Sequence, residues 1–142
     1  MAKADELTLL EFRVIHSELM SISETWADLW LALFLLRIDS GRVICLRYND
    51  IYNGILTLPE TKKHYKKVIK AGDVFLSMIE RRRKNKPKDL YVFQSSSNRV
   101  KGYMKPVTVI AMNMALKKAS KKIEGKKIST KSASKIVTNN MT

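Results

Sequence analysis

The side chains with the clearest chemical potential in this sequence are basic, and they cluster between residues 62 and 67. Four lysines surround His64 and Tyr65 in the order Lys-Lys-His-Tyr-Lys-Lys. Ammonium groups bind phosphates, and a tyrosine can contact a phosphate or stack on a base. If this segment is the tip of a β-hairpin, it is narrow enough to enter a groove of nucleic acid. We therefore expect nucleic-acid contacts from Lys62, Lys63, Tyr65, Lys66 and Lys67.

Other basic side chains follow in separate clusters toward the carboxyl end. The segment 95–101 offers hydroxyl, amide and guanidinium groups shortly before a predicted helix, and a helix amino terminus favours phosphate. Lysines near the end of a helix also complement its dipole, which is the ordinary structural explanation for part of this charge. The further candidate DNA-binding residues are Arg99, Lys101, Lys105, Lys117, Lys118, Lys121, Lys122, Lys126, Lys127, Lys131 and Lys135.

The distribution of charge points to a polyanionic partner. The 142 residues include 27 Lys and Arg against 13 Asp and Glu, for a net charge of +14. Residues 1–60 hold five basic and nine acidic side chains, a net of −4, and residues 61–142 therefore hold +18. Such an excess destabilises a compact state by self-repulsion, so a polyanion is the commonest reason to keep it. Double-stranded DNA is the leading candidate, with RNA left open and an anionic membrane surface second.

We expect this protein to have no metal site, no cofactor and no membrane span. His16, His64 and Cys45 are far apart and match no metal-ligand spacing, and no glycine-rich phosphate loop occurs, so we expect neither metal nor cofactor. The longest apolar run, from Leu29 to Leu36, is eight residues, whereas a membrane span needs about 20. A single cysteine and an acidic amino-terminal segment are typical of a cytoplasmic protein that is not secreted.

Hydrophobic periodicity predicts a mostly helical α+β fold with a small antiparallel hairpin or three-stranded sheet. Helices are expected over 7–20, where Thr8 and Glu11 can form a capping box, and from Ser23 or Glu24 to Leu36. About one helical turn follows over 42–46. We expect strands over 52–58 and 65–70 around a hairpin tip at 61–64.

The remaining elements are a helix, a strand and a second helix. The first helix should begin at 71–73 and bury Val74, Phe75, Met78 and Ile79. A short strand over 90–93 and a loop over 94–102 follow. The last helix should run from Pro106 to Gly125, with Val109, Met112, Ala115, Leu116 and Ala119 on its buried side. We expect one domain over 1–126 and a basic tail over 127–142 that is either a short docked helix or flexible.

The order of these elements, together with a few short motifs, resembles the catalytic domain of tyrosine recombinases, the phage integrases. The motifs are Ser40-Gly41-Arg42, the stretch Leu-Arg-Tyr-Asn-Asp-Ile at 46–51, the lysine-bearing hairpin, Tyr-Val-Phe at 91–93 and Ser-Thr-Lys-Ser-Ala-Ser-Lys at 129–135. The resemblance implies that Arg42 matches the family's first catalytic arginine, and we therefore expect Arg42 to be a DNA-binding residue as well. It also implies that Lys62 or Lys63 matches the family's hairpin lysine.

The same resemblance exposes departures from the catalytic pattern. Cys45 stands where the family has a glutamate, Lys131 replaces the histidine of the His-x-x-Arg motif, and Ser134 replaces its arginine. All five tyrosines precede the expected position of the nucleophile, and seven residues follow Lys135. This family cleaves DNA by attack of a tyrosine while two arginines stabilise the phosphate. We therefore expect a degenerate, carboxyl-terminally truncated and catalytically inactive relative, with no catalytic residues.

These inferences favour a DNA-binding accessory protein of a mobile genetic element. Its role would lie in a relaxosome at a transfer origin during conjugation or mobilisation, in an excision or integration complex, or in regulation. The alternative is an interaction protein that docks an acidic partner, such as a relaxase or nuclease, with incidental DNA binding. A third reading is an enzyme whose tyrosine is supplied by a separate chain. A second DNA-processing protein and a homo-oligomer are both compatible with the sequence.

Overall fold

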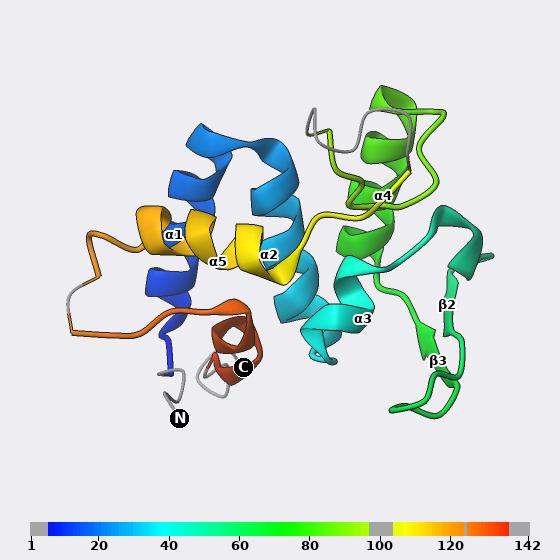
Figure 1. The fold of residues 1–142 in the computed structure, drawn as a ribbon, viewed down its shortest axis with the longest axis horizontal. Helices are drawn as coiled ribbons and strands as arrows, with labels where there is room; N and C mark the ends of the chain where they lie inside the picture. The colour runs from blue at the N-terminus through cyan, green and yellow to red at the C-terminus, as the bar shows by residue number, and fades with distance from the viewer. Residues whose placement is uncertain (1–5, 97–103, 124, 137–142) are drawn as a thin grey trace. The chain divides into compact units, whose positions relative to one another are not determined.

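The computed structural model describes residues 6–96, 104–123 and 125–136, and it confirms a mostly helical α+β fold. The chain divides into two compact units. Unit 1 comprises residues 1–43 and 108–142, and unit 2 comprises residues 44–107. In Figure 1 the first two helices of unit 1 are blue, the helices of its carboxyl-terminal part are yellow to red, and the strands of unit 2 are green. The predicted division at residue 126 stays a prediction.

Unit 1 begins with two consecutive helices, α1 (Leu9–Ile22) and α2 (Glu24–Leu36). The capping box predicted for Thr8 and Glu11 is confirmed, since each side chain accepts a hydrogen bond from the other residue's backbone N–H. Ser23 ends α1 and caps the amino terminus of α2. One serine therefore sets the sharp turn that folds the two helices against each other.

Aromatic side chains form the centre of the contact between α1 and α2. The rings of Phe12 and Trp30 stack with their centroids 5.3 Å apart, and Trp30 Nε1 donates a hydrogen bond of 3.2 Å to the carbonyl of Phe12. The ring of Trp30 is fully buried. Burial of a large aromatic with its N–H satisfied is strongly stabilising, so this pair fixes the register of the two helices.

The carboxyl-terminal part of the chain completes unit 1. Helix α5 (Val109–Ala119) packs on α1 and buries Met112 and Leu116, while the 3-10 helix η3 (Thr130–Lys135) packs on α2 and α5. Figure 1 shows α5 lying beside α1. Ala133 and Ile136 are buried. Helices at both ends of the chain therefore share one core.

Unit 2 is built on a three-stranded antiparallel sheet in the order β1-β2-β3. The strands are β1 (Ile51–Tyr52), β2 (Ile55–Leu58) and β3 (Lys67–Lys70), preceded by a 3-10 helix, η1 (Tyr48–Asp50). Asn53 and Gly54 both have positive φ, at 49° and 77°, as a two-residue hairpin turn of type I′ requires. The single strand predicted over 52–58 is thus split by this turn.

Helix α4 (Asp73–Asn85) follows the sheet and buries Phe75, Met78 and Ile79, as predicted. Arg82 is also buried. Its Nε donates a hydrogen bond of 2.9 Å to the carbonyl of Val92, and its guanidinium lies 5.3 Å from the ring centroid of Phe93. The buried cation thus has both a hydrogen bond and an aromatic face in compensation for its desolvation.

Three local predictions are wrong. Residues 90–93 form a turn rather than a strand, because Gln94 Oε1 accepts hydrogen bonds from the N–H groups of Leu90 and Tyr91 and curls the backbone. The last helix ends at Ala119 instead of reaching Gly125. Val74 is 60% exposed and Val109 is 37% exposed, since both lie in a first helical turn rather than on the core-facing stripe.

Candidate nucleic-acid interface

The tip of the hairpin between β2 and β3 is shaped by Thr61. Its backbone N–H donates to the carbonyl of His64 at 2.9 Å, and its hydroxyl accepts from the N–H groups of Lys63 and His64 at 3.3 and 3.1 Å. A threonine side chain that binds its own turn in this way replaces backbone hydrogen bonds that the tip cannot form. The tight turn holds Lys62 and Lys63 at the end of the ribbon.

Pairing of the two strands orients the rest of the hairpin. Leu56 pairs with Ile69 and Leu58 with Lys67, and both leucines are buried. One face of the ribbon is therefore anchored in the core of unit 2. The lysines at positions 62, 63, 66 and 67 are exposed, and Tyr65 is 87% exposed.

None of these four lysines forms an ion pair with a carboxylate among the residues that the structure describes. Lys70, at the end of β3, is also exposed and extends the basic surface. Lys70 was not among the predicted DNA contacts, although its position in the strand predicted over 65–70 places it on the same hairpin. The hairpin therefore presents five ammonium groups that are available to an external anion.

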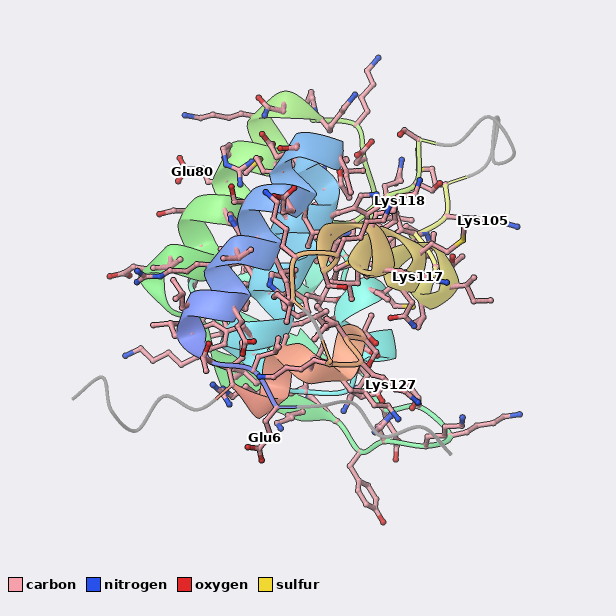
Figure 2. All side chains as sticks on the ribbon, turned by 90° about the vertical axis from the view of Figure 1, so that its left-hand side faces the viewer. Glu6, Glu80, Lys105, Lys117, Lys118 and Lys127 are labelled. Carbon is pink, nitrogen blue, oxygen red and sulfur yellow. The ribbon has the colours of Figure 1, made fainter. Side chains whose placement is uncertain are left out.

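The lysines of α5 and the segment after it belong to unit 1. Lys117 and Lys118 are exposed in the last turn of α5, and Lys121 is exposed just beyond it. Figure 2 labels Lys117, Lys118 and Lys127, which project from the surface of the ribbon. Lys127 is exposed, as is Lys105 in unit 2. These positions remain predicted phosphate contacts.

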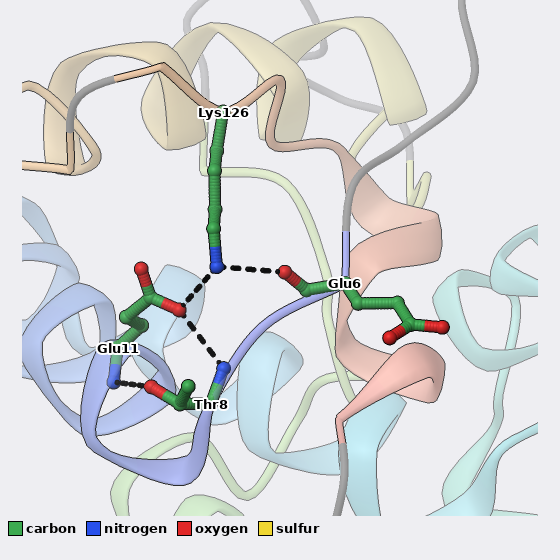
Figure 3. Close-up of polar contacts among 4 residues, drawn as sticks. All are labelled: Glu6, Thr8, Glu11 and Lys126. Atoms are coloured by element: carbon green, nitrogen blue, oxygen red, sulfur yellow. Dashed lines mark hydrogen bonds and ion pairs between the residues drawn. The ribbon is translucent and has the colours of Figure 1, made fainter.

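Two of the predicted DNA-binding lysines already have carboxylate partners within unit 1. Lys126 Nζ lies 2.6 Å from Glu11 Oε1 and donates a hydrogen bond of 3.0 Å to the carbonyl of Glu6 (Figure 3). The hydrogen bond from Lys126 is the main cause that lowers the pKa of Glu11, helped by the backbone N–H of Thr8. Lys122 Nζ lies 2.6 Å from Glu18 Oε1, which raises the pKa of Lys122.

Two of the motifs on which the resemblance rests, 40–42 and 129–135, come together in unit 1. Arg42 lies in the short helix α3 (Ser40–Ile44), which begins two residues earlier than expected, and is partly exposed. Ser40 and Lys131 line the same cavity of about 200 Å³, and Thr130 Oγ1 lies 3.4 Å from Ser40 Oγ. Segments 90 residues apart in the sequence are thus adjacent.

The remaining predicted site residues are Arg99, Lys101 and Lys135. Arg99 and Lys101 lie outside the described residues. The backbone of Lys135 ends η3.

No group of three or more histidine, cysteine or acidic side chains with the arrangement of a metal site occurs in the described part of the chain. Across residues 6–96, 104–123 and 125–136, no helix combines the length and apolar character of a membrane span.

Comparison with solved structures identifies the architecture. The chain superposes on a lambda integrase dimer bound to a COC′ core site with a TM-score of 0.71 and 14% sequence identity, covering 94% of this chain and 39% of that one. It superposes equally well on lambda integrase(75-356) in a dimer bound to the same site, with 15% identity over 94% of this chain and 51% of that one. The chain has an integrase-like fold.

The predicted resemblance to tyrosine recombinases is confirmed at the level of the fold. The integrase-like chain spans only about two-fifths to one-half of the integrase chains that it matches. No family model matches it, and no curated protein matches its sequence. Three-dimensional arrangement therefore carries the likeness, with very little sequence identity.

Proposed function

We propose that this integrase-like chain binds double-stranded DNA through its β2-β3 hairpin, does not cleave it, and serves as an accessory protein of a mobile genetic element. One observation carries the proposal. The hairpin of an integrase-like fold presents Lys62, Lys63, Lys66 and Lys67 to solvent without carboxylate partners in the described residues. Ammonium groups in this state gain most from contact with phosphates, because no internal ion pair must be broken first.

The geometry of the hairpin supports a groove contact. A two-stranded ribbon fits the major groove of B-form DNA, and its charged tip can reach the phosphates on either side. Tyr65 adds an exposed ring and hydroxyl at the same tip. Phosphate contacts of this kind give affinity and position, whereas base contacts determine sequence preference.

Substitutions at the matched catalytic positions support binding without cleavage. Cys45, Lys131 and Ser134 stand where the resemblance places a glutamate, a histidine and an arginine. A serine cannot supply the guanidinium that braces a phosphate in the transition state, and loss of one such donor costs about 3 kcal/mol. Binding by lysines needs none of these groups, so it is retained when the chemistry is lost.

The experiment measures binding and cleavage on the same molecules. The purified protein is titrated into a fluorescent duplex in an anisotropy assay, and then incubated with a nicked suicide duplex that traps any covalent tyrosine adduct. We expect salt-sensitive binding and no adduct on a denaturing gel. A covalent adduct would contradict the loss of cleavage.

A second experiment tests the role as an accessory protein. It measures whether the protein binds DNA without a partner and whether it prefers particular DNA sequences. We expect the protein alone to shift a duplex and to prefer the DNA of its own element over unrelated duplexes. Binding only in the presence of a relaxase or nuclease, without sequence preference, would instead support the alternative of an adaptor that docks an acidic partner.

A further inference from the structure

A groove in unit 2, distinct from the hairpin tip, lies between the η1-β1 segment and α4. It has a volume of about 470 Å³ and is lined by Tyr48, Asn49, Ile51, Ile79, Glu80, Arg83 and Lys84. Its apolar lining comes from Ile51, Ile79 and the ring of Tyr48. Its rim is charged. The groove is therefore amphipathic, and none of its residues is among the predicted DNA contacts.

Arg83 is held in place at the rim of this groove. Its guanidinium lies 4.4 Å from the ring centroid of Tyr48, and its Nη1 donates a hydrogen bond of 2.5 Å to the carbonyl of Asp89. A guanidinium has five N–H donors, so several remain for an external carboxylate. Because stacking and the hydrogen bond already restrict the side chain, little rotamer entropy is lost when it binds.

The surrounding segment is strongly basic. Residues 80–89 contain six Lys and Arg against two acidic side chains. Arg82 is buried and donates its hydrogen bond to the carbonyl of Val92. Lys86 and Lys88 are exposed to solvent. Lys84 forms a long, solvent-exposed ion pair of 3.9 Å with Glu80. The electrostatic potential near the groove therefore attracts an acidic ligand.

We propose that this groove binds an acidic peptide segment of a partner protein, with one apolar side chain inserted between Ile51 and Ile79 and carboxylates paired with Arg83 and Lys84. Carboxylates pair with a guanidinium in bidentate geometry, and the apolar lining contributes the burial that makes a hot spot. This interaction is independent of the proposed DNA-binding function.

Two features favour a peptide over a nucleic acid as the occupant. Glu80 on the rim can accept hydrogen bonds from the N–H groups of a peptide backbone, whereas a phosphodiester backbone carries no such donors. One face of the Tyr48 ring is covered by Arg83, so that face is closed to a stacking base. An apolar lining contributes little to phosphate recognition.

The test uses a fluorescein-labelled peptide, Asp-Glu-Asp-Leu-Phe-Asp-Glu-Asp, and the full chain. A second peptide carries Ser-Ser in place of Leu-Phe, and an octamer of thymidylate serves as the nucleic-acid probe. We expect the Leu-Phe peptide to bind about tenfold more tightly than the Ser-Ser peptide, because only the first fills the apolar lining. Equal affinities, or no binding of either peptide, would overturn the proposal.

Paired charge reversals separate the groove from diffuse attraction. The double variant Arg83→Glu with Lys84→Glu should weaken peptide binding by about tenfold or more, whereas Lys86→Glu with Lys88→Glu, with the same change in net charge, should weaken it less than about threefold. Equal losses would show nonspecific electrostatics and overturn the site.

A measurement on the unmodified protein guards against misfolding of the variants. Amide chemical shifts that move on addition of the Leu-Phe peptide should map to residues 48–51 and 79–84. Shifts confined to other residues, or the same groove shifts on addition of the thymidylate octamer, would contradict a peptide site. Binding of duplex DNA by the hairpin is expected to continue in every groove variant, so failure of either proposal can be recognised separately.

Discussion

The lysines of the hairpin and two lysines that follow α5 are chemically identical but differ in their surroundings. Lys62 and Lys63 are exposed at a turn and have no carboxylate partner in the described structure, whereas Lys122 and Lys126 lie 2.6 Å from Glu18 and Glu11. An ammonium group that already compensates an internal carboxylate gains less from a phosphate, because the internal pair must be broken. A basic run in sequence is therefore not automatically one binding surface.

The ion pairs with Lys122 and Lys126 also give the acidic residues of α1 a structural role. Glu11 accepts from Thr8 within the capping box and pairs with Lys126, so one carboxylate caps a helix and ties a distant segment to it. The negative charge of residues 1–60 is thus partly an internal counterpart of the positive charge that follows. Net charge over halves of the chain overstates what remains for DNA.

The largest expected effect follows removal of all four hairpin lysines, by Lys62→Ala, Lys63→Ala, Lys66→Ala and Lys67→Ala together. Affinity for a duplex should fall by about a hundredfold at low salt, because each ammonium group releases a counterion on binding. Fluorescence anisotropy measures the change. The side chains are exposed, so the circular dichroism spectrum should stay that of the wild type, and an unchanged affinity would refute the hairpin as the DNA contact.

The variant Lys126→Met should lower the free energy of unfolding by about 1–2 kcal/mol, because Glu11 and the carbonyl of Glu6 lose a charged donor. Urea denaturation followed by circular dichroism measures this. Lys122→Met is the matched control, since the Lys122 side chain is 72% exposed and solvent screens its pair with Glu18. Equal destabilisation by both variants would mean that the Lys126 contact is no stronger than a surface pair.

Removal of the cap by Thr8→Ala should lower the free energy of unfolding by about 1 kcal/mol, because the N–H of Glu11 loses its acceptor. Thr8→Ser keeps a hydroxyl at the same position and should restore most of the stability. The same denaturation assay applies. If the serine variant is as unstable as the alanine variant, the loss of methyl packing rather than the hydrogen bond is responsible.

The smallest effect is a pH dependence due to Glu11. Its pKa is lowered in the folded protein from the ordinary value of 4.5, chiefly by the hydrogen bond from Lys126. The stabilisation is therefore complete above the unfolded pKa and is lost as the pH falls through the folded pKa. Unfolding measured from pH 7 to pH 3 should show the wild type converging on Glu11→Gln at the acidic end, and a constant difference would contradict it.

Local signals were sufficient to predict much of the fold. Thr8 with Glu11 marked the start of α1, Ser23 marked the junction with α2, and the turn residues around Thr61 marked the hairpin. These features depend on hydrogen bonds within a few residues. The strand predicted over 90–93 failed because apolar composition does not reveal that the Gln94 side chain accepts hydrogen bonds from the N–H groups of Leu90 and Tyr91.

Less of the candidate site than of the fold could be predicted from the sequence. Exposure of Lys62 and Lys63 followed from their place at the hairpin tip, which the local turn residues indicated. The pairing of Lys126 with Glu11 joins residues 115 apart, and the groove brings Tyr48 beside Arg83. Such contacts depend on tertiary packing, so neither composition nor spacing could separate lysines that pair with a carboxylate from lysines that have no such partner in the described residues.

The central claim is that the hairpin lysines, rather than every lysine in the chain, bind DNA. The most direct measurement compares the salt dependence of duplex binding for two double variants of equal net charge, Lys62→Ala with Lys63→Ala and Lys122→Ala with Lys126→Ala. The slope of log K against log salt is negative, and it should become less steep by about 1.8 for the hairpin pair and by less than about 0.5 for the other pair. Equal decreases in the two slopes would contradict the account.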